Sequence, residues 1–152
     1  MIKKQKNLIR KVKFGINCKI VQPVNLYECD LSDNVFVGPF VEITKGVKIG
    51  KNTKISSHSF VCELVSVGKN CFIAHGVMFT NDLFKNGKLG GSVENWFSTV
   101  IGDNVLIGSN STILPVNIIS GCVIGAGSVV TRDCKIKGVY AGNPAKLLRK
   151  LD

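Results

Sequence analysis

Apolar residues recur at every sixth position along most of this chain. The series runs from Leu31 to Phe79 without an error, stops, and resumes at Ile101. Four positions after most members stands a small or β-branched residue, such as Val35 or Val41. Neither the period of an α-helix nor the alternation of a plain strand gives a repeat of six over this many cycles. The repeat therefore predicts a solenoid built from short strands and corners.

The same repeat predicts a triangular prism. In a three-residue strand such as residues 35–37, the outer two side chains share a face and point inward. Three repeats then close one coil of about eighteen residues, and residues eighteen apart stack about 4.8 Å apart in successive coils. We therefore expect an all-β parallel β-helix with a core of valine and isoleucine. Cys71, Cys122 and Cys134 fall in inward slots, which indicates packing rather than chemistry.

Composition agrees with this fold and excludes several classes of protein. The chain has 152 residues and 16 glycines, which suits a single β-rich domain over residues 1–152. No apolar run reaches the length of a membrane span, and the basic start lacks the apolar stretch of a signal peptide. The six cysteines form no C-x-x-C motif and are expected to be free thiols. We expect a cytoplasmic protein with no membrane partner.

The net charge of +10 is concentrated near the start of the chain. Residues 1–19 contain no acid, and such a run can contact nucleic acid or another anionic surface. The aromatic residues that accompany basic ones in single-strand binding proteins are missing, so we interpret the run as a solvated end and expect no nucleic-acid partner. Its basic residues are Lys3, Lys4, Lys6, Arg10, Lys11, Lys13 and Lys19.

The repeat is interrupted between Asn81 and Ser98. This segment carries Asn-Gly and Gly-Gly pairs, lysines and the only tryptophan, Trp96. A long loop inside a compact repeat is usually functional, although solenoids also accept neutral insertions at corners. Trp96 fits a functional loop and also fits a cap over an exposed coil.

One of the two histidines stands just before the interruption. The eighteen-residue spacing stacks His75 over Ser57, beside His58, and stacks Asn81 over Glu63. Both pairs fall at corners and face outward, but the corners differ and lie a full side apart. The two pairs can meet only if the loop folds back or a neighbouring subunit supplies one of them. Spacing alone fits a solvated corner histidine as well as a catalytic one.

The repeats VFVGPFVEI, IGSNSTILP and IGAGSVV resemble those of left-handed β-helix acyltransferases, over nearly the whole chain. The ending GVYAGNPAKLLRKL is similar to the way these enzymes close. The resemblance implies a left-handed coil with an inserted loop over residues 81–98 and a cap over residues 142–152 that includes a short helix. It also implies a homotrimer with active sites between subunits, and acetyl-CoA as cosubstrate without a metal.

Several shorter stretches resemble a narrower group within these acyltransferases. HSFVCELVSV, HGVMFTND, the late tryptophan and ILPV resemble nucleotide-sugar N-acetyltransferases that act on a 3-amino sugar linked to dTDP or UDP. The sequence departs from that group at Ala74, where Gly is frequent, and at residues 84–87, where an aromatic-Pro pattern is usual. The resemblance implies N-acetylation of such a sugar during assembly of a surface polysaccharide such as lipopolysaccharide.

The resemblance also assigns roles to residues. It makes His75 the catalytic base or the contact to the amine, although in some relatives the cofactor sulfur takes the proton. Histidine accepts a proton near neutral pH, and a positioned base is worth about 10²–10⁴-fold in rate. Backbone N–H groups at glycine corners can hold the oxyanion. The expected sugar-binding residues are Asn81, Asp82, Glu63, His58 and Trp96.

Acetyl-CoA is expected along the C-terminal coils, in the groove between two prisms. Its pantetheine amides would pair with corner backbone near Gly108, Ser109 and Ala126. Its phosphates require positively charged side chains. For any single candidate lysine or arginine, however, ordinary surface charge is the simpler interpretation. The candidates are Arg132, Lys135, Lys146 and Arg149.

Three alternatives use the same fold. One is an O-acetyltransferase acting on a sugar or another small hydroxyl acceptor, and a second is a non-catalytic β-helix scaffold. The third, a carbonic anhydrase with zinc on three histidines, is excluded because the chain has only His58 and His75.

Overall fold

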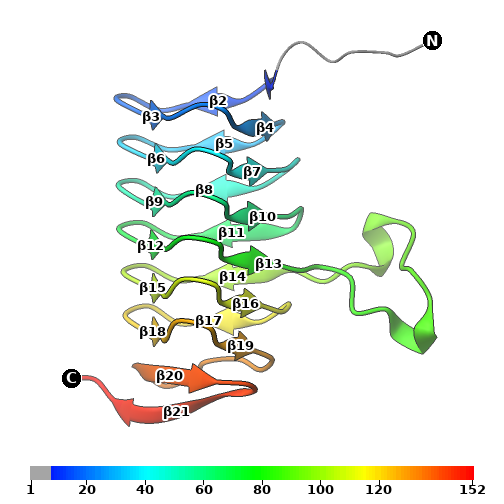
Figure 1. Cartoon of the computed structure of the whole chain (residues 1–152), viewed down its shortest axis with the longest axis vertical. Coiled ribbons are helices and arrows are strands. Elements are labelled where there is room, and N and C mark those ends of the chain that lie inside the picture. Colours follow the sequence, from blue (N-terminus) through cyan, green and yellow to red (C-terminus); the bar gives the residue numbers. More distant parts are fainter. Residues whose placement is uncertain (1–7) are drawn as a thin grey trace.

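The computed structural model describes residues 8–152 and shows a prism of stacked coils with three sheets as its sides, whose strands are parallel up to the C-terminal hairpin (Figure 1). Strands that pair within a sheet come from successive coils. Phe36 pairs with Lys54 and Lys54 with Phe72, so the predicted spacing of eighteen residues is confirmed in this part of the chain. The architecture is the parallel β-helix that the repeat predicts, and it is consistent with the left hand that the resemblance implies. Lys3, Lys4 and Lys6 of the basic run lie outside the described residues.

Most strands are two or three residues long. The seven-stranded sheet contains β1 (Ile9–Arg10), β4 (Asn25–Tyr27), β7 (Glu42–Ile43), β10 (Phe60–Val61), β13 (Met78–Phe79), β16 (Thr112–Ile113) and β19 (Val129–Val130). The six-stranded sheet contains β2 (Lys13–Phe14), β5 (Asp30–Leu31), β8 (Lys48–Ile49), β11 (Val65–Val67), β14 (Thr99–Ile101) and β17 (Asn117–Ile118). The eight-stranded sheet contains β3 (Lys19–Ile20), β6 (Phe36–Val37), β9 (Lys54–Ile55), β12 (Phe72–Ile73), β15 (Leu106–Ile107), β18 (Val123–Ile124), β20 (Gly138–Gly142) and β21 (Ala145–Lys150).

The core is the predicted column of inward side chains. Val35 and Val37 are fully buried, whereas Phe36 between them faces outward and stays partly exposed. The inward cysteines pack in this column, as predicted, and Cys134 is 1% exposed. Burial raises the pKa of the Cys134 thiol to about 12 and that of Cys29 to about 11.

Native cysteine reactivity should follow burial. The thiolate is the reactive form, so burial and the raised pKa values of Cys29 and Cys134 should make both thiols slow to react near neutral pH. We expect iodoacetamide to modify the half-buried Cys18 first and all six cysteines only after unfolding. Peptide mass spectrometry over time measures this order. Equal rates at Cys18 and Cys134 in the folded protein would contradict it.

The C-terminal segment differs from the prediction. The expected short helix is wrong, because residues 138–150 form an antiparallel hairpin of β20 and β21. The chain reverses after Gly142, whose φ of 103° suits glycine. Val139 and Tyr140 extend the eight-stranded sheet by pairing with β18. Pairing of β21 with β20 therefore outweighs the local helix propensity of AKLLRK.

Two edges of the prism carry His75 and the predicted sugar-binding and pantetheine-binding residues. The histidine edge, between the eight- and seven-stranded sheets, consists of corners 38–40, 56–58, 74–76, 108–110 and 125–127. The loop edge, between the seven- and six-stranded sheets, consists of corners 44–46 and 62–64 and of the loop 81–98. The loop leaves after β13, projects from the prism and returns at β14 (Figure 1). It contains two single 3₁₀ turns, η1 (Lys85–Gly87) and η2 (Val93–Asn95). No helix within residues 8–152 is long and apolar enough to cross a membrane.

Candidate active site

His75 lies exposed on the histidine edge, just after β12. Its Nδ1 atom is 2.8 Å from the Oγ atom of Ser57 in the coil before, which confirms the predicted stacking. This contact occupies one ring nitrogen and orients the imidazole, so Nε2 remains for an external partner. His58 lies in the same coil as Ser57 and stacks on Phe40, with ring centroids 4.8 Å apart and an interplanar angle of 16°.

Three buried serine hydroxyls brace the histidine edge from inside. Each donates to the carbonyl of the first residue of a corner, so the backbone of that corner is fixed before any ligand binds. The pairs are Ser59 with Ala74 at 2.9 Å, Ser111 with Gly108 at 2.8 Å, and Ser128 with Gly125 at 2.6 Å.

The predicted pantetheine contacts share this edge with His75. The Asn110 N–H donates to the His75 carbonyl at 2.8 Å, so the corner of Gly108 and Ser109 lies directly over His75. Ala126 follows one coil further on. A Cβ atom on Gly108 would lie 2.4 Å from the Ala126 nitrogen, so only glycine permits this approach of two coils. Within the described chain, the N–H groups of Ser109 and Ala126 donate to no main-chain carbonyl.

The four predicted phosphate-binding cations are not gathered at one place in the single chain. Lys146 pairs with Ala141, which lies beside Gly125 of the histidine edge. Arg132 follows β19 on the side of the loop edge, and Lys135 lies 4.0 Å from Asp133 in an exposed ion pair. Arg149 stands further along β21.

Asn81 anchors the loop to the loop edge. Its Nδ2 atom donates to the main-chain carbonyl of Glu63 at 3.2 Å, and its own carbonyl accepts the Phe97 N–H at 2.9 Å. The predicted stacking of Asn81 over Glu63 is confirmed. His75 and Asn81 therefore stand on different edges, and one chain does not bring them together.

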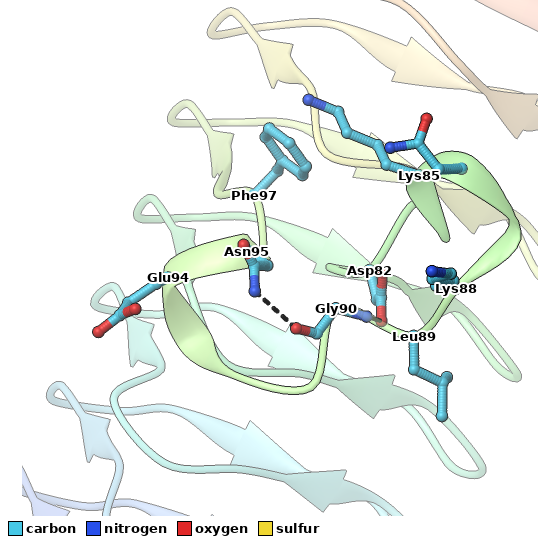
Figure 2. A pocket seen from close by; sticks show the side chains of 9 residues that line it. Asp82, Lys85, Lys88, Leu89, Gly90, Glu94, Asn95 and Phe97 are labelled. Carbon is cyan, nitrogen blue, oxygen red and sulfur yellow. Dashed lines mark hydrogen bonds between the residues drawn. The ribbon is translucent and has the colours of Figure 1, made fainter.

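Asp82 organises the loop. Its Oδ1 atom accepts the Phe84 N–H at 2.9 Å and its Oδ2 atom accepts the Gly90 N–H at 2.7 Å. Figure 2 shows the carboxylate directed at Gly90 inside the loop. The sequence predicts Asp82 as a sugar contact, whereas both of its oxygens bind the loop backbone.

Replacing Asp82 with alanine should loosen the loop and leave the prism intact. Losing the acceptor of two backbone N–H groups costs about 1–3 kcal/mol, which raises the open fraction of the loop by about 5- to 150-fold. Trypsin cleavage after Lys85 and Lys88 measures this opening.

Asp103→Ala is the matched control, because Asp103 accepts the Lys69 N–H at 2.9 Å at a corner of the prism outside the loop. Its loss should lower thermal stability without exposing the loop. Equal trypsin rates for Asp82→Ala and the unmodified protein would contradict the role of Asp82.

A groove separates the loop from the prism. Its volume is about 630 Å³, and it brings together the predicted contacts Glu63 and Trp96. The Trp96 ring also supports the loop, since a Cβ atom on Gly90 would lie 3.0 Å from Trp96 Cδ1. The other residues that line the groove are Lys45, Gly46, Leu64, Gly91, Ser92 and Val93. Among residues 8–152 no group of three or more His, Cys, Asp or Glu side chains is placed to hold a metal ion.

Comparison with known families agrees with this architecture. Residues 29–63 match the bacterial transferase hexapeptide model of six repeats, and residues 98–132 match the hexapeptide repeat of succinyl-transferase. These two segments of the chain are therefore similar to hexapeptide-repeat transferases.

Solved structures that are similar to this chain include several transferases. A hexapeptide transferase family protein from Anaplasma phagocytophilum has a TM-score of 0.72 at 18% identity, over 93% of this chain and 80% of that one, and shows the fold. The polySia-specific acetyltransferase NeuO has a TM-score of 0.63 at 26% identity, over 93% and 83% of the two chains. Galactoside acetyltransferase in complex with coenzyme A has a TM-score of 0.63 at 28% identity, over 94% and 66%.

Proposed function

We propose that this protein transfers acetyl from acetyl-CoA to an amino group, at C3, of a dTDP- or UDP-linked sugar for a surface polysaccharide. The observation that carries the proposal is the histidine edge, where an oriented, exposed His75 lies under the corners of Ser109 and Ala126. The similarity to galactoside acetyltransferase bound to coenzyme A supports the cosubstrate, and that to NeuO supports an acceptor containing sugar. Six free thiols support a cytoplasmic location.

His75 is the proposed general base. When Nδ1–H donates to Ser57 Oγ, Nε2 is free to accept the proton of the attacking amine. The N–C bond then forms as the thioester C–S bond breaks, and His75 returns the proton to the departing sulfur. The N–H groups of Ser109 and Ala126 have free donors for amide carbonyls of the pantetheine arm. Lys146, nearest the histidine edge, is the best placed of the four cations for a phosphate.

A homotrimer would complete this site. The acceptor contacts Asn81, Glu63 and Trp96 lie on the loop edge, a full side from His75, so a neighbouring subunit has to present one set. The two sheets that flank the histidine edge carry several apolar outward side chains among polar ones such as Lys54 and Glu42, whereas the six-stranded sheet is mainly polar apart from Val100. The apolar set includes Met78 at 39% exposure, Phe72 at 36% and Leu106 at 45%, and the polar set includes Lys48, Ser66 and Asn117. Burial of these apolar side chains favours packing around the histidine edge.

A hydroxyl acceptor is the second candidate. The names of NeuO and galactoside acetyltransferase specify no amine, so O-acetylation of a sugar fits the same histidine edge and the same cosubstrate. The attacking atom alone separates the two reactions.

The deciding experiment follows thiol release from acetyl-CoA. The acceptors are dTDP- and UDP-linked 3-amino and 4-amino sugars, with the corresponding hydroxyl sugars as controls. We expect release with a 3-amino sugar and none with its hydroxyl counterpart. Release with hydroxyl sugars alone would establish O-acetylation, and no release together with no coenzyme A binding by calorimetry would indicate a scaffold.

A further inference from the structure

The inserted loop contains a cavity of its own. Its volume is about 360 Å³, and it is distinct from the groove beside Trp96. Figure 2 shows the two arms of the loop around it, with η1 on one side and η2 on the other. Its lining residues are Asp82, Lys85, Asn86, Lys88, Leu89, Gly90, Glu94, Asn95 and Phe97.

Two lysines and two carboxylates line this cavity. Lys85 Nζ lies 4.4 Å from the centroid of the Phe97 ring, which holds the ammonium group at the cavity wall. Neither Lys85 nor Lys88 joins any of the ion pairs within the described residues. Both oxygens of Asp82 are engaged by backbone N–H groups, and Glu94 points away from the lysines in Figure 2. Lys85 and Lys88 therefore line the cavity outside these ion pairs, while the Asp82 carboxylate is engaged by the loop backbone.

We propose that the loop cavity binds the diphosphate group of the nucleotide-linked acceptor. Ammonium groups are strong partners of phosphate oxygens, and Asn86 adds an amide donor at the same wall. This inference rests on the proposed function and adds the group by which the acceptor is held. Coenzyme A also contains a diphosphate. The acceptor is assigned because the cavity belongs to the loop that carries Asn81 and Trp96, whereas the free backbone donors of Ser109 and Ala126 lie on the histidine edge.

The test is calorimetry of the full chain with UDP, dTDP and coenzyme A as separate probes. Lys85→Gln/Lys88→Gln nearly keeps side-chain length and removes both charges. We expect UDP or dTDP to bind at least about tenfold more weakly, with coenzyme A affinity unchanged. The control, Lys19→Gln/Lys51→Gln, removes two exposed charges from the prism and should bind all three probes as the unmodified protein does.

The possible results distinguish the identity of the ligand from the place where it binds. Weakened coenzyme A binding with unchanged nucleotide binding would overturn the assignment to the acceptor, and so would a protein that binds neither UDP nor dTDP. Nucleotide affinity unaffected by the double substitution would overturn the cavity as a diphosphate site. Because these probes need no acetyl transfer, a failure of the proposed reaction shows only in the thiol-release assay. Where transfer occurs, KM for the linked amine should rise about tenfold with kcat little changed.

Discussion

Replacing His75 with glutamine is expected to lower kcat for acetyl transfer by about 10²–10⁴-fold, the usual contribution of a positioned general base. Glutamine retains hydrogen bonding at the corner but accepts no proton from the attacking amine. The side chain is exposed, so thermal stability should change little. Steady-state thiol release at saturating acetyl-CoA and acceptor measures the loss.

Ser57→Ala separates orientation from proton transfer. The Ser57 hydroxyl contacts His75 Nδ1, and a single hydrogen bond of about 0.5–1.5 kcal/mol corresponds to a loss of about 2- to 12-fold. The fall should appear in kcat, with KM for acetyl-CoA unchanged, and Lys51→Gln on another edge serves as the control. A His75→Gln enzyme with near-normal kcat would show that the leaving sulfur takes the proton directly.

The features that the sequence predicted are those that the repeat enforces. A slip of one residue would turn Val35 and Val37 outward, so burial fixes the register, and the eighteen-residue spacing places His75 on Ser57 and Asn81 on Glu63. Ser57 was therefore visible in the sequence, although its role as a partner of Nδ1 was not singled out.

The features that the sequence did not predict depend on contacts that do not follow the six-residue repeat. The hydrogen bond from Gly90 to Asp82 and the contact of Lys85 with Phe97 exist only once the loop has folded. The sequence alone does not indicate which residue a carboxylate or a lysine in a loop will contact. The C-terminal hairpin was missed for a similar reason, because β20 pairs with the open edge of β18 and β21 then pairs with β20, whatever the local helix propensity of AKLLRK.

Ile49→Ala is expected to destabilise the prism by about 2–5 kcal/mol, the range for truncating a large buried aliphatic side chain to alanine. Ile49 is 1% exposed and pairs with Leu31 in the coil before and Val67 in the coil after, so its loss leaves a cavity between two coil interfaces. Denaturant unfolding measures the change. The neighbouring Lys48→Ala is the matched control, because Lys48 on the same strand faces outward and should cost less than about 0.5 kcal/mol.

The destabilisation caused by an isoleucine-to-alanine substitution should depend on which coil of the solenoid carries the residue. Ile20 in the first coil pairs only with Val37 among the described strands, and it is half-buried, so Ile20→Ala should destabilise less than Ile49→Ala. In a stack where each coil contacts its neighbours, a central residue stabilises two interfaces and a terminal one stabilises a single interface. Equal unfolding midpoints for Ile49→Ala and Lys48→Ala would contradict a core made of inward isoleucines. Equal costs at Ile20 and Ile49 would instead show that the first coil is covered in solution.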